Sequence, residues 1–399
     1  QCIPINLCIC VYFRRTTVCL HPSYRAWDFR HTMPGIMHVT RLQLLLPFAL
    51  PSAADASTAL YNLAIPALEK LVARATLVER VIGEDFQRTL PHERWVARQF
   101  GAVSPTQPAA DEAPLAPYML RADGGEPGEA TWACVQPVHV RIAHDHLVLI
   151  DPQALDLQDD EAATLLAVAR PLIEELGVRI EAPKPSRWYL SSDGFGSLAG
   201  ASPLRASGRN IEIWLPHEAH TGERSRAWMK LQNEVQMAWF EHPVNEEREA
   251  RGLPAVNSIW FHAQGVAQPV TSPFTHVMSN AAATRGLALS AGVKTDAPPP
   301  SYAAFAATSP EGEGEGGTLV EIDPFSAPYI EQDWARWNQV FAALEADWLA
   351  PALDALQSGA LGELGLTLCG DTGSVTLTAT RGDLRKFWRR RVFASLFIE

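Results

Sequence analysis

Strand-like and helix-like segments alternate along most of this chain, and that alternation limits its fold more than any other feature. Short apolar runs of strand length occur at 38–46, 319–322 and 364–369, and amphipathic helical periods at 223–240 and 334–356 lie among them. Because parallel strands need a long crossover, usually a helix, this order predicts an α/β fold with a mostly parallel sheet.

The remaining segments follow the same logic. We expect further strands and helices at 62–74, 133–139, 146–150, 159–175, 179–182, 186–190, 258–261 and 375–380, of which 62–74 and 159–175 are helical. The strands at 133–139 and 146–150 are expected to pair with each other. Two stretches rich in Pro, Gly and acidic residues, 101–131 and 295–318, predict long solvated connections.

The first 36 residues do not share this pattern. Their basic residues, Arg14 and Arg15, follow the apolar run instead of preceding it, which is the wrong order for a secretory signal. The run is also shorter than the ~20 residues that span a bilayer. We interpret 1–36 as a disordered or non-native N-terminal extension.

Cysteine usage separates the same segment from the rest. Four of the six cysteines lie there, at Cys2, Cys8, Cys10 and Cys19. A zinc site is the alternative interpretation, but no second ligand pair follows at the usual spacing. The two scattered thiols elsewhere, Cys134 and Cys369, predict a reducing compartment and a cytoplasmic protein.

Charge limits the partners. The chain carries 33 Lys and Arg against 45 Asp and Glu, a net charge of −12, whereas neutralising nucleic-acid phosphates needs clustered cations. We therefore expect neither a nucleic-acid nor a membrane partner. The one obvious basic cluster is at the end of the chain, at Arg385, Lys386, Arg389, Arg390 and Arg391.

One block, HPVNEEREARGLPAVNSIW, holds most of the candidate site residues. Asn245 is a good N-cap for a helix over 246–251, and Gly252 suits the position just past its end. A capped connecting helix explains these two residues. The alternative is that His242, Asn245, Arg248 and Asn257 bind a ligand, whereas in the structural interpretation His242 bonds a carbonyl and Asn257 ties a turn.

Two smaller candidates lie upstream. Arg187 could contact an anion through both ends of its guanidinium group, or it could be a solvated strand-edge residue. His144 and His146 would share a strand face and could begin a metal site, but an exposed hairpin turn explains them equally simply. Neither a nucleophile elbow nor a phosphate-binding loop motif occurs.

The same block resembles the cofactor-independent phosphoglycerate mutases of the archaeal type. The residues that match the family pattern in order are His242, Pro243, Val244, Asn245, Arg248, Gly252, Pro254, Ala255, Asn257, Ile259, Trp260, Gln264 and Gly265. More narrowly, the block resembles bacterial RpfE-type regulatory proteins. The resemblance implies an alkaline-phosphatase-like α/β sandwich, with a core at 37–150 and 255–399 and a smaller α/β domain inserted at 151–254.

The resemblance also implies a chemistry from which this chain departs. Enzymes of that superfamily hold two Mn²⁺ or Zn²⁺ ions with Asp and His ligands and use a Ser or Thr nucleophile. Here the first strand ends without a carboxylate before Asp55, the last histidine is His276, and Asp371-Thr372 stands where an Asp-His pair would be expected.

We therefore predict a catalytically degenerate protein that acts as a regulatory or binding module. It is expected to have no catalytic residues, no metal and no cofactor, and to bind an unknown protein partner or a small anionic ligand. The alternative is an active metal-dependent, 2,3-bisphosphoglycerate-independent mutase or a related phosphohydrolase.

Overall fold

The computed structural model describes residues 41–84, 86–103, 112–218, 222–308 and 316–397. All of them belong to one compact unit, His38–Glu399. The predicted extension at 1–36 lies outside the described residues.

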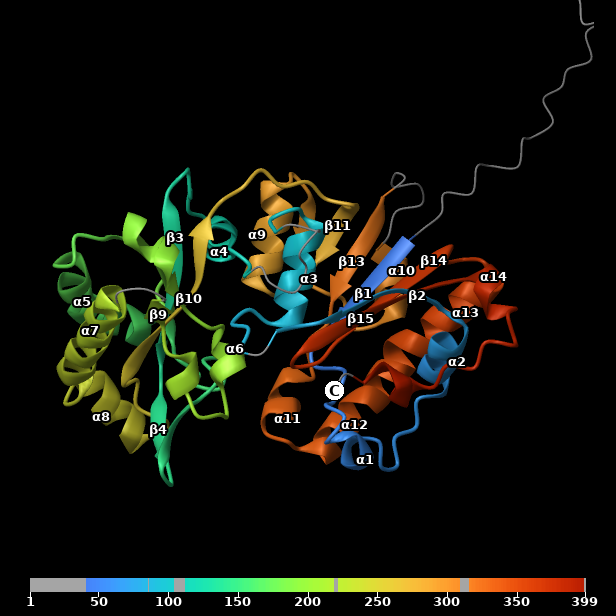
Figure 1. Ribbon diagram of the computed structural model, residues 1–399, viewed down its shortest axis with the longest axis horizontal. Helices are drawn as coiled ribbons and strands as arrows, with labels where there is room; N and C mark the ends of the chain where they lie inside the picture. Colours follow the sequence, from blue (N-terminus) through green and yellow to red (C-terminus); the bar gives the residue numbers. More distant parts are fainter. Residues whose placement is uncertain (1–40, 85, 104–111, 219–221, 309–315, 398–399) are drawn as a thin grey trace, which may run out of the picture. The chain divides into compact units, whose positions relative to one another are not determined.

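A mixed sheet of seven strands forms the centre of this unit (Figure 1). Its order is β12 (Lys294–Asp296), β11 (Phe274–Met278), β13 (Gly317–Glu321), β1 (Arg41–Leu46), β14 (Glu363–Cys369), β15 (Gly373–Thr380) and β2 (Thr76–Ile82). The first five strands are parallel, and β15 and β2 are antiparallel to their neighbours. The predicted α/β fold with a mostly parallel sheet is confirmed.

A second sheet is wholly antiparallel. Its order is β10 (Ser258–Val266), β3 (Thr131–Val138), β7 (Arg187–Ser191) and β6 (Arg179–Lys184). Two small pairs accompany it, β4 (Val140–Ala143) with β5 (His146–Leu149) and β8 (Leu198–Ala199) with β9 (His217–Glu218). β6 and β7 lie within the predicted inserted domain, 151–254, whereas β3 and β10 lie outside it, so this sheet contains strands from both predicted domains. The domain boundaries stay a prediction.

The expected pairing of 133–139 with 146–150 is wrong. β3 pairs with β7 and β10, whereas β5 pairs with β4 in a tight hairpin. His144 adopts the positive φ that this turn needs, so β4, the short strand just before the turn, pairs with β5.

Fourteen helices connect and cover these strands in the described part of the chain. They are α1 (Ala56–Ala59), α2 (Pro66–Arg74), α3 (Pro91–Gln99), α4 (Ala116–Ala122), α5 (Asp159–Glu174), α6 (Pro203–Ala206), α7 (Glu223–Trp239), α8 (Pro243–Ala250), α9 (Ala282–Ser290), α10 (Tyr302–Thr308), α11 (Ser326–Ile330), α12 (Trp334–Leu344), α13 (Ala350–Ser358) and α14 (Arg381–Leu384). A π-helical turn, Glu345–Leu349, joins α12 to α13, so the long helix predicted at 334–356 is confirmed.

The two predicted loops are wrong in part. α4 lies inside the stretch 101–131 and α10 inside 295–318. Both helices are short apolar segments between stretches rich in Pro and Gly, and the composition of these flanks predicts a loop. Tertiary burial of Tyr118 and Phe305 nevertheless stabilises the helices.

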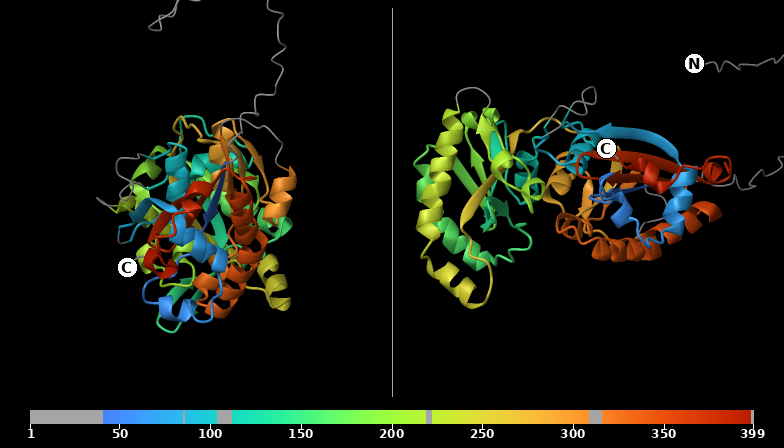
Figure 2. Two further views of the ribbon diagram at one scale, coloured as in Figure 1. Left: turned by 90° about the vertical axis from the view of Figure 1, so that its right-hand side faces the viewer. Right: turned by 60° about the horizontal axis from the view of Figure 1, so that its bottom comes forward.

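Helices cover both faces of the central sheet. Leu42, Leu44 and Leu46 of β1 pack with α2, α12 and α13, and Leu45 packs on the opposite face with α3, α4 and α9. Figure 2 shows α12 and α13 running along one side of the sheet. Burial of both faces explains why β1 is a nearly continuous apolar run.

One glycine fixes the packing of α9 on α4. A Cβ at Gly286 would lie 1.8 Å from the carbonyl oxygen of Tyr118. No larger residue fits that gap, so glycine sets the distance between the two helices.

Candidate ligand-binding site

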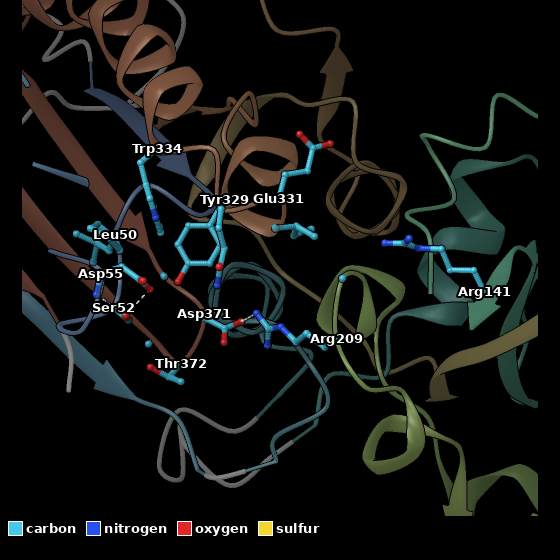
Figure 3. A pocket seen from close by; sticks show the side chains of 16 residues that line it. Leu50, Ser52, Asp55, Arg141, Arg209, Tyr329, Glu331, Trp334, Asp371 and Thr372 are labelled. Atoms are coloured by element: carbon cyan, nitrogen blue, oxygen red, sulfur yellow. Dashed lines mark hydrogen bonds and ion pairs between the residues drawn. The ribbon is translucent and has the colours of Figure 1, made fainter. Parts of the chain in front are cut away.

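The carboxyl ends of β1 and β14 lie side by side, and the segments that follow them line a cleft of about 720 Å³ (Figure 3). Side chains from three other parts of the chain complete it, from β4, from the segment after α6 and from α11 and its C-terminal flank. Open α/β sheets bind their ligands at this edge.

A tight turn between β14 and β15 places Asp371 in the cleft. The Gly370 N–H donates to the carbonyl of Gly373 at 2.8 Å, which closes the turn. A Cβ at Gly370 would lie 2.8 Å from the carbonyl oxygen of Leu50, so the loop after β1 approaches as closely as only glycine allows.

Two arginines hold the carboxylate of Asp371. Arg205 donates to its Oδ1 at 2.9 Å and to its backbone carbonyl at 2.6 Å, and Arg209 donates to Oδ1 at 2.8 Å. Arg205 is almost fully buried, and burial lowers the pKa of its guanidinium group while Asp371 raises it. Charge-assisted bonds of this kind are about twice as strong as neutral ones, so Asp371 is firmly paired.

Other polar groups of the cleft have unused capacity. The Tyr329 hydroxyl points into it, and burial raises the pKa of this phenol, which therefore stays protonated (Figure 3). Arg141 on β4 is exposed and makes no hydrogen bond or ion pair with any described residue. Ser52 and Asp55 bond each other at 2.6 Å. The cleft thus offers a free guanidinium group, a phenol and the outer side of Arg209.

A second cavity of about 490 Å³ lies at the carboxyl ends of β11 and β13. Burial raises the pKa of Glu93 to about 7 and that of Asp323 to about 6. Burial also lowers the pKa of His92 and of His262 to about 3, so both imidazoles are neutral. Arg187 also lines this cavity, so the lining combines carboxyl groups of raised pKa, neutral imidazoles and a guanidinium group.

The helix cap predicted at Asn245 is wrong. The N-cap of α8 is His242, whose Nδ1 accepts from the Val244 N–H at 3.3 Å. Asn245 is buried in the first turn of the helix, where it bonds the Trp239 carbonyl and both the N–H and the carbonyl of Val256. Pro243 can start the helix because the first helical position needs no N–H donor.

Arg248 and Asn257 also bond within the protein. Arg248 is fully buried and donates to Glu161 at 2.6 Å and to the Pro254 carbonyl at 2.9 Å. Asn257 pairs with the N–H and carbonyl of Val140. The structure thus brings His242, Asn245, Arg248 and Asn257 into one region around α8, and none of the four lines either cavity.

Arg187 lies apart from that group, at the second cavity. Its guanidinium forms two 2.7 Å bonds with the two carboxylate oxygens of Asp123, and the Tyr189 hydroxyl donates to the same carboxylate at 2.6 Å. Asp123 is thus the anion that Arg187 contacts within the chain, and the pair raises the pKa of the guanidinium.

Histidine provides no metal cluster in the part of the chain that the structure describes, where no three His, Cys, Asp or Glu side chains are arranged to hold an ion. His144 lies in the β4–β5 turn, and His146 bonds the exposed Asp145. Among the same residues, no helix has the length and hydrophobicity that crossing a bilayer requires.

Sequence reasoning missed the residues that shape the cleft. Arg141, Arg205, Arg209 and Tyr329 come from three distant parts of the chain and belong to no motif. Only Asp371 had a local signal, its position directly after a buried strand.

No protein-family model matches this chain, and no curated protein matches it. Solved structures do resemble it. The PH0037 protein from Pyrococcus horikoshii is similar over 86% of this chain and 88% of its own, at 11% identity and a TM-score of 0.47. The cofactor-independent phosphoglycerate mutase from Thermoplasma acidophilum is similar over 90% of this chain and 94% of its own, at 14% identity and a TM-score of 0.45.

Proposed function

We propose that this chain is a phosphoglycerate-mutase-like protein that binds a small anionic ligand in the cleft and does not convert it, so that it acts as a regulatory or binding module. The observation that carries the proposal is the pairing of Asp371 with Arg205 and Arg209. The narrower resemblance to RpfE-type regulatory proteins agrees with such a role.

Two guanidinium groups on Asp371 oppose metal chemistry at this strand end. A divalent ion bound by Asp371 would lie close to Arg205 and Arg209. The guanidinium nitrogens of these two arginines already lie 2.9 and 2.8 Å from the Oδ1 atom of Asp371. Displacing a buried arginine leaves an uncompensated charge, which costs roughly 3–5 kcal/mol. Asp371 is therefore better suited to orienting the arginines than to binding a cation.

The same arginines favour an anion. Arg141 and the partly exposed Arg209 both line the cleft, and the Tyr329 hydroxyl adds a donor. Guanidinium forks match the geometry of phosphate and carboxylate oxygens. A cleft of about 720 Å³ is of the size that holds small organic ligands. We therefore infer a small acid that carries a phosphate or a carboxylate.

Active metal-dependent turnover is the second candidate, and one observation favours it. Glu321 and Asp323 line the second cavity together with Asp151, and carboxylate oxygens are the ligands that Mg²⁺ prefers. Against it, the side chains of Glu321 and Asp323 already accept hydrogen bonds from Ser279 and Ser326, respectively.

Calorimetric titration of the purified chain with inorganic phosphate and with 3-phosphoglycerate tests the binding proposal. Arg141→Met should weaken binding by about tenfold, because it removes a charge-assisted contact worth about 1.4 kcal/mol or more. Arg226→Met, on the exposed face of α7 and outside both cavities, is the matched control and should bind as the unchanged protein does. Absence of binding by either probe, or equal binding by both variants, would contradict the proposal.

A further inference from the structure

The outer edge of β2 is an unusual surface. β2 is the last strand of the central sheet and pairs only with β15 among the described strands. Its side chains Leu77, Val78 and Ile82 are nevertheless 39%, 60% and 55% exposed. Natural sheets usually protect a free edge with charges, proline or a covering segment. The two charged residues of β2, Glu79 and Arg80, bond Arg98 and the Ser395 carbonyl within the chain, so the exposed apolar side chains mark a place where another chain can pair.

The backbone of this edge has free hydrogen-bonding groups. The Gly83 N–H donates to the Thr372 carbonyl at 2.7 Å, which fixes the alternation of the ladder between β2 and β15. In an antiparallel ladder the next residue along the strand faces away from its partner. The N–H and carbonyl groups of Ile82 and Arg80 therefore point outward.

A basic and aromatic segment, residues 385–392, runs beside β2. Arg389 donates to the Arg74 carbonyl at 2.9 Å and to the Thr76 hydroxyl at 3.1 Å. Farther along, Arg80 on β2 donates to the Ser395 carbonyl at 2.6 Å. The end of the chain is thus held against the strand at two points.

This segment exposes two aromatic rings. Phe387 and Trp388 are 72% and 65% exposed, and their centroids lie 5.4 Å apart. Tryptophan and arginine are the residues most enriched where protein partners bind tightly. An exposed neighbouring pair of large rings on a folded unit is therefore a strong candidate for a contact surface.

Positive charge accumulates here and is only partly compensated. Asp383 is within ion-pair distance of Lys386 and Arg389, but no described carboxylate pairs with Arg385, Arg390 or Arg391. Burial lowers the pKa of Arg391, and the nearby cations Arg389 and Arg80 lower it further. In a chain whose net charge is −12, this surface attracts acidic partners.

We propose that the β2 edge and residues 385–392 together bind an acidic segment of a partner protein, which adds to the central sheet as a further strand. Main-chain pairing along β2 supplies the affinity, and the unpaired arginines select glutamate and aspartate side chains. A second copy of this chain is a poorer occupant, because it would bring an equally positive surface to the contact. Lipid and nucleic acid have no peptide backbone that could match the outward N–H and carbonyl groups of Arg80 and Ile82 together. The proposal is independent of the function proposed for the cleft.

Fluorescence anisotropy with labelled ten-residue peptides tests this surface. A peptide of alternating glutamate and valine should bind, and one of alternating lysine and valine should not. Ile82→Pro removes an outward N–H and leaves the β15 ladder intact, so binding should fall by about tenfold or more. The matched control Ile82→Thr keeps the N–H and should bind within about threefold of the unchanged chain.

Arg390→Glu gives a second readout at an exposed position outside β2, and it should also weaken binding by about tenfold. Three results would overturn the proposal. The first is equal binding of both peptides. The second is binding to phosphatidylserine vesicles or single-stranded oligonucleotides that needs the Trp388 side chain and that Ile82→Pro leaves unchanged. The third is self-association that Ile82→Pro abolishes while the acidic peptide shows no binding.

Discussion

Asn245 shows how a residue that is prominent in the sequence can act differently in the fold. Its type suits a helix cap, but the protein uses His242 there and buries Asn245 against three backbone groups. No local pattern could reveal this, because two of the three groups belong to Val256, eleven residues farther along the chain.

Asn245→Ala should therefore destabilise the chain by more than the loss of a cap. Three buried backbone groups lose their partner, which we expect to cost about 2–4 kcal/mol in urea unfolding. Asn257→Ala is the comparison, because it breaks two bonds at a partly buried site and should cost about 1–2 kcal/mol. Equal costs for the two variants would argue against the buried bridge.

His92 makes stability depend on pH. Burial lowers its pKa in the folded state to about 3, and its Nδ1 is buried without a partner. The unfolded chain binds a proton at His92 below about pH 6.5, whereas the folded chain does not, so its contribution to stability is lost as the pH falls from about 6.5 towards 3.

His92→Phe should remove that loss, since phenylalanine keeps the edge contact with Phe48 and does not titrate. The free energy of unfolding is measured for the variant and for the unchanged protein at pH 7 and at pH 4.5. The difference between the two proteins should shift by about 3 kcal/mol in favour of the variant between pH 7 and pH 4.5. His217→Phe, at an exposed position on β9, serves as the control and should show no such dependence. A difference that stays constant between the two pH values would contradict the assignment.

At the level of elements, long periodic segments are predictable from sequence and short buried ones are not. The apolar stripes at 223–240 and 334–356 predict the helices found there, and Trp228 and Trp337 of these stripes are buried as expected. α4 and α10 have only seven residues each, too few to establish a period, and tertiary packing decides their state. The prediction of which strands pair was wrong for a related reason, because the whole sheet and the β4–β5 turn determine the partner of each strand.

The contact between α4 and α9 gives a prediction at this scale. Gly286→Ala places a methyl group against the Tyr118 carbonyl, so the two helices must separate, at a cost of about 2–3 kcal/mol. Gly292→Ala is the matched control at the end of the same helix. It has a φ of +72° but no atom within 4 Å of the added Cβ, and it should cost about 1 kcal/mol. Thermal unfolding of both variants distinguishes close packing from backbone strain.

For the whole molecule, the sequence predicts the architecture better than the site. Alternating elements are enough to predict the α/β class. The cleft, in contrast, assembles Arg141, Arg209 and Tyr329 from segments that only the folded topology brings together. The block that carries the family resemblance lies around α8 and joins α5, α8, β4 and β10. Its residues are explained by these internal contacts, and the ligand-binding role predicted for them stays a prediction.

The central claim is binding without turnover, and one assay tests it most directly. The purified chain is incubated with 3-phosphoglycerate and Mn²⁺, with and without a chelator, and formation of 2-phosphoglycerate is followed while bound metal is measured on the same sample. Because Arg205 and Arg209 already pair with Asp371, we expect no conversion above the protein-free rate and no near-stoichiometric Mn or Zn. Chelator-sensitive conversion by a sample that holds about one metal ion per chain or more would contradict the account and establish the chain as an active mutase.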